Sequence, residues 1–126
     1  RRAINSLQAG ASLGKPVNSE VVYSVVGHAN PADVQAMLKI VMGGSFVEAR
    51  KRLREMIVKY GVSGSDIIKQ IHIELFRLDI AEEWKVRLAS VVGEVDFRLV
   101  EGADEEVQLS ALLARLAEAG YAMKGG

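Results

Sequence analysis

The sequence predicts an all-α fold, a bundle of helices, on three observations. Apolar residues recur at three- and four-residue spacing throughout the 126 residues, and no run alternates apolar and polar side chains between turn signals. Hydrophobic residues make up 49% and charged residues 25% of the chain, which is the balance of a globular protein. Capping residues, glycines and prolines divide the chain into segments of helical length. We therefore expect six or seven helices around a hydrophobic core.

The first two helices are predicted over residues 1–13 and 19–26. Gly14 ends the first helix, and a proline follows shortly after. Arg1 and Arg2 occupy its first turn, where the helix dipole disfavours positive charge. We expect this helix to begin upstream, or the arginines to meet an anion. Because the first residue is not methionine, we also expect the chain to be part of a longer one.

Three further helices are predicted in the middle of the chain, over residues 31–42, 45–60 and 65–78. The stretch "HANPAD" supplies the N-cap Asn30 and a proline at the first helical position, and we place a domain boundary there. Ser45 and Glu48 have the spacing of a capping box. Ser63 or Ser65 is expected to cap the third of these helices.

The helix predicted over 81–101 has two apolar faces, whereas an ordinary surface helix has one. The first face carries Trp84, Leu88, Val91, Val92, Val95 and Leu99, and the opposite face carries Val86, Ala89, Gly93, Phe97 and Val100. Exposure of several such side chains forgoes several kcal/mol at about 25 cal/mol per Å². Either this helix is the central one of its own bundle, or one face packs on another subunit. The residues leave these two accounts about even.

A last helix is predicted over residues 103–119, after Gly102. It places Leu109, Leu112, Leu113 and Leu116 in one arc, and the final "YAMKGG" is expected to fray.

Composition excludes several classes of protein. Sixteen basic residues balance sixteen acidic ones, so no overall charge draws the chain to nucleic acid or to a membrane. Cysteine is absent, which excludes disulfides and thiolate metal sites. The apolar runs are too short to span a bilayer, and the amino end lacks the apolar region of a signal peptide. We expect an intracellular, cytoplasmic protein.

No motif for catalysis or metal binding fits. "GASLGKP" resembles a phosphate-binding loop, but its glycines are one residue too close and a proline replaces the Ser or Thr that follows the lysine. His28 and His72 lack the partners and the spacing of a zinc site. The basic run "EARKRLREM", with the basic residues of 50–54, is interpreted as a solvated helix face. A contact of that face with DNA stays an open alternative.

The segments at residues 1–14, 43–56, 60–76 and 93–116 together resemble the carboxy-terminal part of the small subunit of archaeal replication factor C, the sliding-clamp loader. "RRAINSLQAGASLG" resembles the sensor-2 helix of its AAA+ ATPase module, and "GGSFVEARKRLREM", "YGVSGSDIIKQIHIELF" and "GEVDFRLVEGADEEVQLSALLARL" resemble segments of its helical collar. The resemblance covers essentially the whole chain. It implies a remnant of the AAA+ lid over 1–29 and a collar domain, which assembles subunits, over 30–126.

The resemblance also implies a function. In this family one large and four small subunits form a ring through their collars and use ATP with magnesium to load a sliding clamp onto primer-template DNA. The family's sensor-2 arginine, which touches the γ-phosphate of ATP, falls on Arg1. The other ATPase motifs do not occur in this sequence, so we expect no ATP hydrolysis by this chain and no bound cofactor. Its partners are expected to be the other clamp-loader subunits, with homo-oligomers when it is isolated.

The resemblance favours the account in which one face of the 81–101 helix contacts another subunit. The residues predicted in that interface are Phe97, Arg98, Val100, Glu101, Leu109, Leu112 and Leu116. Arg98 and Glu101 are expected to form ion pairs across it or to remain solvated. Two alternatives stay open: the helical tail of another AAA+ ATPase, and a standalone helical interaction module.

Overall fold

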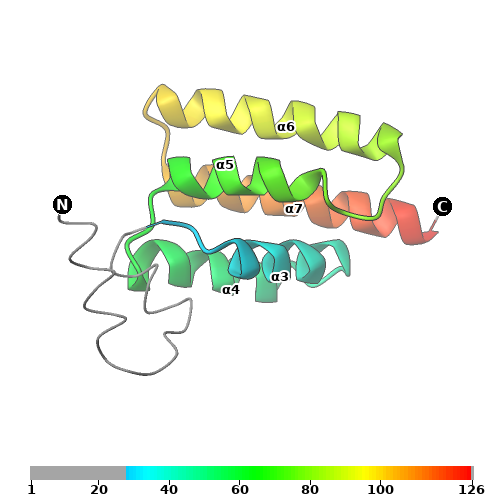
Figure 1. Cartoon of the computed structure of the whole chain (residues 1–126), viewed down its shortest axis with the longest axis horizontal. Helices are drawn as coiled ribbons and strands as arrows, with labels where there is room; N and C mark the ends of the chain where they lie inside the picture. Colours follow the sequence, from blue (N-terminus) through cyan, green and yellow to red (C-terminus); the bar gives the residue numbers. More distant parts are fainter. Residues whose placement is uncertain (1–27, 126) are drawn as a thin grey trace, which may run out of the picture.

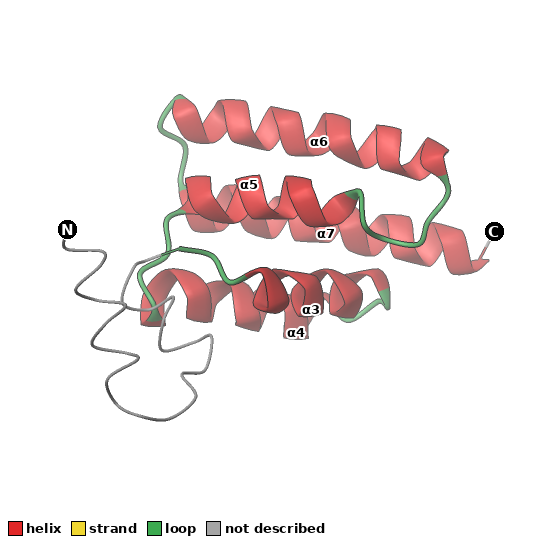
Figure 2. Ribbon diagram, viewed as in Figure 1, coloured by secondary structure: helices red, strands yellow, loops and turns green. Residues whose placement is uncertain are grey.

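The computed structural model describes residues 28–125, and this part of the chain is a helical bundle without strands (Figures 1 and 2). Its elements are α3 (Pro31–Met42), α4 (Phe46–Arg54), the π-helical turn η1 (Glu55–Lys59), α5 (Gly64–Leu75), α6 (Glu82–Val100) and α7 (Glu105–Gly125). This confirms the predicted all-α class. The helices predicted over residues 1–13 and 19–26 lie outside the described residues.

The helices are arranged so that α7 is central and α6 is peripheral. In Figure 1, α5 and α7 lie between α6 on one side and α3 with α4 on the other. The contacts agree, because α7 packs against each of the other four α-helices, whereas the main contacts of α6 are with α5 and α7. Among the described residues, the account of the 81–101 helix as the central one is therefore wrong.

Local signals fix most helix boundaries. The Asn30 side chain accepts a hydrogen bond from the Ala32 amide at 2.9 Å, and the Ser63 hydroxyl accepts one from the Asp66 amide at 3.1 Å. The Asn30 cap was predicted, and Ser63 is one of the two alternatives predicted for α5. The capping box at Ser45 is not formed, because the Ser45 side chain makes no capping hydrogen bond. Gly102, with a φ of 97°, separates α6 from α7 as predicted.

The carboxyl end of α7 is ordered by contacts with the turn after α3, where the sequence predicted fraying. The Tyr121 hydroxyl donates a hydrogen bond to the Gly44 carbonyl at 2.9 Å, and the Lys124 ammonium donates one to the Gly43 carbonyl at 2.8 Å. Gly120 lies directly against the backbone of Met42. The last turns of α7 therefore hold the carboxyl end of α3, where a positive charge is also favourable to the helix dipole.

Candidate subunit interface

The inner face of α6 belongs to the core. Leu88, Val92 and Val95 are buried, and Trp84, Val91 and Leu99 pack against the core. This side of the helix meets α5 and α7, so one of the two predicted apolar faces is fully explained by the bundle.

The opposite face of α6 is exposed in the described structure, and we call it the outer stripe. Its residues are Val86, Ala89, Gly93, Phe97 and Val100. Val86 is 63% exposed, Phe97 64% and Val100 75%. No atom lies within 4 Å of the position that a β-carbon on Gly93 would take. Ala89 is partly buried against the core, whereas the described helices leave the rest of this face uncovered.

The apolar surface continues from the outer stripe onto α5. Ile73 on α5 and Phe76, directly after its end, are about half exposed. Two open grooves run between the helices, one of about 390 Å³ bordered by Ile73 and Gly93, and one of about 610 Å³ bordered by Phe76 and Val86. A contiguous apolar patch with hollows of this kind is typical of a protein interaction surface.

Charged residues border the outer stripe. Arg98 lies 3.7 Å from Glu94 on the same helix, and Arg87 lies 3.1 Å from Glu83. Lys85 donates a hydrogen bond to the Phe76 carbonyl at 3.0 Å. Arg98 and Glu101 are exposed, so both are accessible to a neighbouring chain. An apolar centre with a charged rim is the usual composition of an interface.

The structure corrects the assignment of three leucines to this interface. Leu109, Leu112 and Leu116 are each 0% exposed and belong to the core of the bundle. The physical reason is that α7 contacts α3, α4, α5 and α6, so its leucine arc is already covered within the chain. We therefore no longer propose these three residues as contacts with another subunit.

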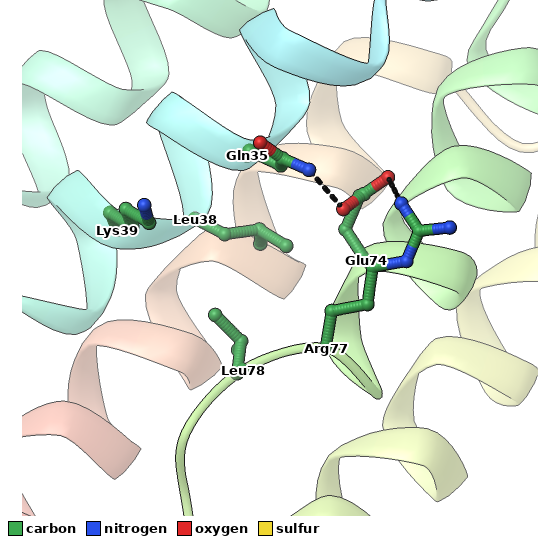
Figure 3. A pocket seen from close by; sticks show the side chains of 6 residues that line it. All are labelled: Gln35, Leu38, Lys39, Glu74, Arg77 and Leu78. Atoms are coloured by element: carbon green, nitrogen blue, oxygen red, sulfur yellow. Dashed lines mark hydrogen bonds and ion pairs between the residues drawn. The ribbon is translucent and has the colours of Figure 1, made fainter.

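A buried carboxylate that the sequence analysis missed joins α3 to α5 (Figure 3). Glu74 is 1% exposed and lies at a pocket of about 150 Å³. It accepts hydrogen bonds from Gln35 and Gln70, each at 2.8 Å, and from Arg77 at 3.2 Å. These three donors satisfy a buried charge, so the cluster stabilises the fold. The available signal was a glutamate within the apolar arc of a helix, flanked by Gln70 and Arg77.

The other predicted candidates contribute no catalytic or metal site. His28 lies 3.3 Å from Asp66, and His72 is stacked edge-on against Phe76. Over residues 28–125, no group of His, Cys, Asp and Glu is arranged to hold a metal ion. That part of the chain also contains no helix with the length and hydropathy to cross a membrane. Arg1 and "GASLGKP" lie outside the described residues.

The basic run on α4 is partly engaged within the bundle. Arg54 lies 2.7 Å and Arg50 3.4 Å from the Glu106 carboxylate of α7. Since two of its four cations share an acidic partner, the run connects α4 to α7. This arrangement gives no support to the contact with DNA that the sequence left open.

Comparison with known proteins identifies the family. Residues 29–115 match the family model described as the replication factor C C-terminal domain. The replication factor C small subunit of Staphylothermus marinus is 52% identical over 126 residues, which is 98% of this chain and 38% of the relative. The small subunits of Sulfolobus acidocaldarius (47% identical; 100% of this chain and 39% of the relative) and Pyrococcus furiosus (50%; 91% and 14%) are similar. This chain thus spans less than two-fifths of the length of these relatives. The family match, which covers more than half of the chain, shows that this chain belongs to the replication factor C C-terminal domain family.

Proposed function

We propose that this chain is an association module, the collar of a clamp-loader small subunit, and that its outer stripe contacts a neighbouring subunit. The observation that carries the proposal is the exposed apolar surface of α6 and α5 around Phe97, Val100 and Phe76. Covering such side chains contributes about 25 cal/mol per Å². The inner face of the same helix needs no partner outside the chain.

Within a longer protein, this module would hold the ATPase parts of several subunits together. The proposed assembly is a ring that uses ATP and magnesium to load a sliding clamp onto primer-template DNA inside the cell. Arg1 would contribute a contact with the γ-phosphate of ATP. The division into the end of the lid, over 1–29, and the collar, over 30–126, remains a prediction. None of these roles requires a reaction catalysed by this chain.

The proposal is tested by binding of this chain to a full-length small subunit. The probe is the replication factor C small subunit of Staphylothermus marinus, which is 52% identical over this region. We expect a complex in size-exclusion chromatography with light scattering. The substitution Phe97→Asp should abolish it, while Val47→Asp, at a 79% exposed position on α4, should not. Equal binding by both variants, with unchanged helical circular dichroism, would refute the proposal.

A further inference from the structure

The outer stripe has the same pattern in both directions along α6. Counted from Gly93, Ala89 and Phe97 lie four positions away on either side, and Val86 and Val100 lie seven positions away. At 100° per residue, these five positions fall within an arc of about 80°. A surface with this pattern is complementary to a copy of itself turned by 180°, which is the condition for a two-fold dimer.

We propose that two copies of this chain pair through their outer stripes, with the two α6 helices antiparallel and the two-fold axis beside Gly93. This inference rests on the proposed function, since it takes the outer stripe to be an association surface. Val100 of each copy then lies level with Val86 of the other, and Phe97 lies level with Ala89. The small Ala89 leaves space for the large Phe97, and the two Gly93 residues allow the helices to approach closely.

The grooves beside α6 fit this arrangement. Val86, Ala89 and Phe76 line the groove of about 610 Å³ between α5 and α6. Antiparallel pairing brings Val100, which is 75% exposed, from the other copy to this groove. The exposed ring of Phe76 is then covered as well. Each copy supplies one projecting side chain and one groove, so the same contact forms twice in the dimer.

One pair of rim charges is complementary under the same symmetry. Arg87 and Glu101 lie on the side of the stripe away from α5, and pairing places Arg87 of one copy near Glu101 of the other. Glu94, the carboxylate nearest the axis, already has Arg98 at 3.7 Å within its own helix. Arg98 therefore reduces the repulsion between the two Glu94 carboxylates at the centre of the dimer.

A dimer of this kind has a consequence for assembly. It covers the surface that a neighbouring subunit needs under the proposed function. Self-pairing and entry into a larger assembly therefore compete, and an unassembled chain keeps its apolar surface out of water.

Cysteine cross-linking tests the geometry directly, because the natural chain contains no cysteine. Val86→Cys and Val100→Cys should each form no disulfide-linked dimer alone, because like positions lie about 21 Å apart along the antiparallel helices, but should cross-link when mixed under mild oxidation. Val47→Cys, an exposed valine on α4, controls for random collision. Cross-linking of Val86→Cys with itself, or none in the mixture of Val86→Cys and Val100→Cys, would overturn the proposal.

Charge reversal supplies a second test by analytical ultracentrifugation. Arg87→Glu and Glu101→Arg should each weaken the dimer about two- to thirtyfold, because the exposed pair occurs twice, and the double variant should restore it. No restoration would contradict antiparallel pairing. If the chain is monomeric but still binds the full-length small subunit through Phe97, self-pairing fails and the proposed function stands. If neither complex forms, both fail.

Discussion

Replacement of Gly120 by alanine tests how closely α7 approaches α3. A β-carbon on Gly120 would overlap the Met42 carbonyl oxygen, and it would lie 3.0 Å from the Met42 carbonyl carbon and 3.2 Å from its Cα. These are backbone atoms, which cannot rotate away as a flexible side chain does. The two helices must therefore separate in Gly120→Ala.

The expected change in the free energy of unfolding combines opposing effects. Overpacking of a tight contact costs about 1–3 kcal/mol. Separation also weakens the hydrogen bonds from Tyr121 to Gly44 and from Lys124 to Gly43, each of which contributes about 0.5–1.5 kcal/mol. Alanine regains about 1 kcal/mol of helix propensity. We expect a net loss of roughly 1–3 kcal/mol in the free energy of unfolding.

The matched control is Gly93→Ala, which changes the same residue type inside a helix where no atom lies within 4 Å. This variant should gain up to about 1 kcal/mol from helix propensity alone. Both are measured by urea unfolding followed by circular dichroism, at a dilution at which the chain is monomeric. For a domain of this size, 1 kcal/mol corresponds to a Tm shift of about 4–8 °C. If both substitutions stabilise the chain equally, the inferred contact between α7 and α3 is wrong.

Three further predictions concern stability and use the same urea assay. Ser63→Ala should lose about 1 kcal/mol because it removes a capping hydrogen bond, whereas Ser45→Ala should change stability by only a few tenths; equal losses would contradict the assigned caps. Glu74→Ala should lose about 2–4 kcal/mol because it leaves a void in the core and two half-buried donors without their acceptor, and a neutral result would show that the cluster is solvated. Leu112→Ala should lower the free energy of unfolding by about 2–5 kcal/mol because its side chain is fully buried, whereas Phe97→Ala should lower that of the monomer by less than 1 kcal/mol. The reverse order would mean that Phe97 lies in the core and Leu112 on the surface.

The sequence predicted helices well where both boundaries carry local signals. The helix expected over 31–42 is found over Pro31–Met42, since Asn30 caps it and glycines follow it. The predicted end of α7 was too early, because its last turns are held by contacts with residues far away in the sequence. Tyr121 and Lys124 bond to carbonyls that lie 77 and 81 positions earlier, and no local pattern around "YAMKGG" records those contacts.

The candidate interface was predicted only in part, again because a local sequence pattern does not show which helices become neighbours. The two apolar faces of α6 were visible from periodicity, and the exposed Phe97 and Val100 lie on the predicted outer one. The leucines of α7 were misplaced because an apolar arc shows only that a helix face must be covered. Whether the cover comes from the same chain depends on which helices surround it, and α7 proved to be the helix with the most neighbours.

Gly93 distinguishes the outer stripe from an ordinary exposed patch. A glycine inside a helix costs about 1 kcal/mol relative to alanine, so its presence calls for a compensating contact or a special backbone conformation. Gly120 has such a contact in α3, and Gly102 has a positive φ. Gly93 has neither among the described residues. A second backbone approaching from outside the described bundle would supply the missing compensation, and this is why the centre of the proposed dimer is placed at Gly93.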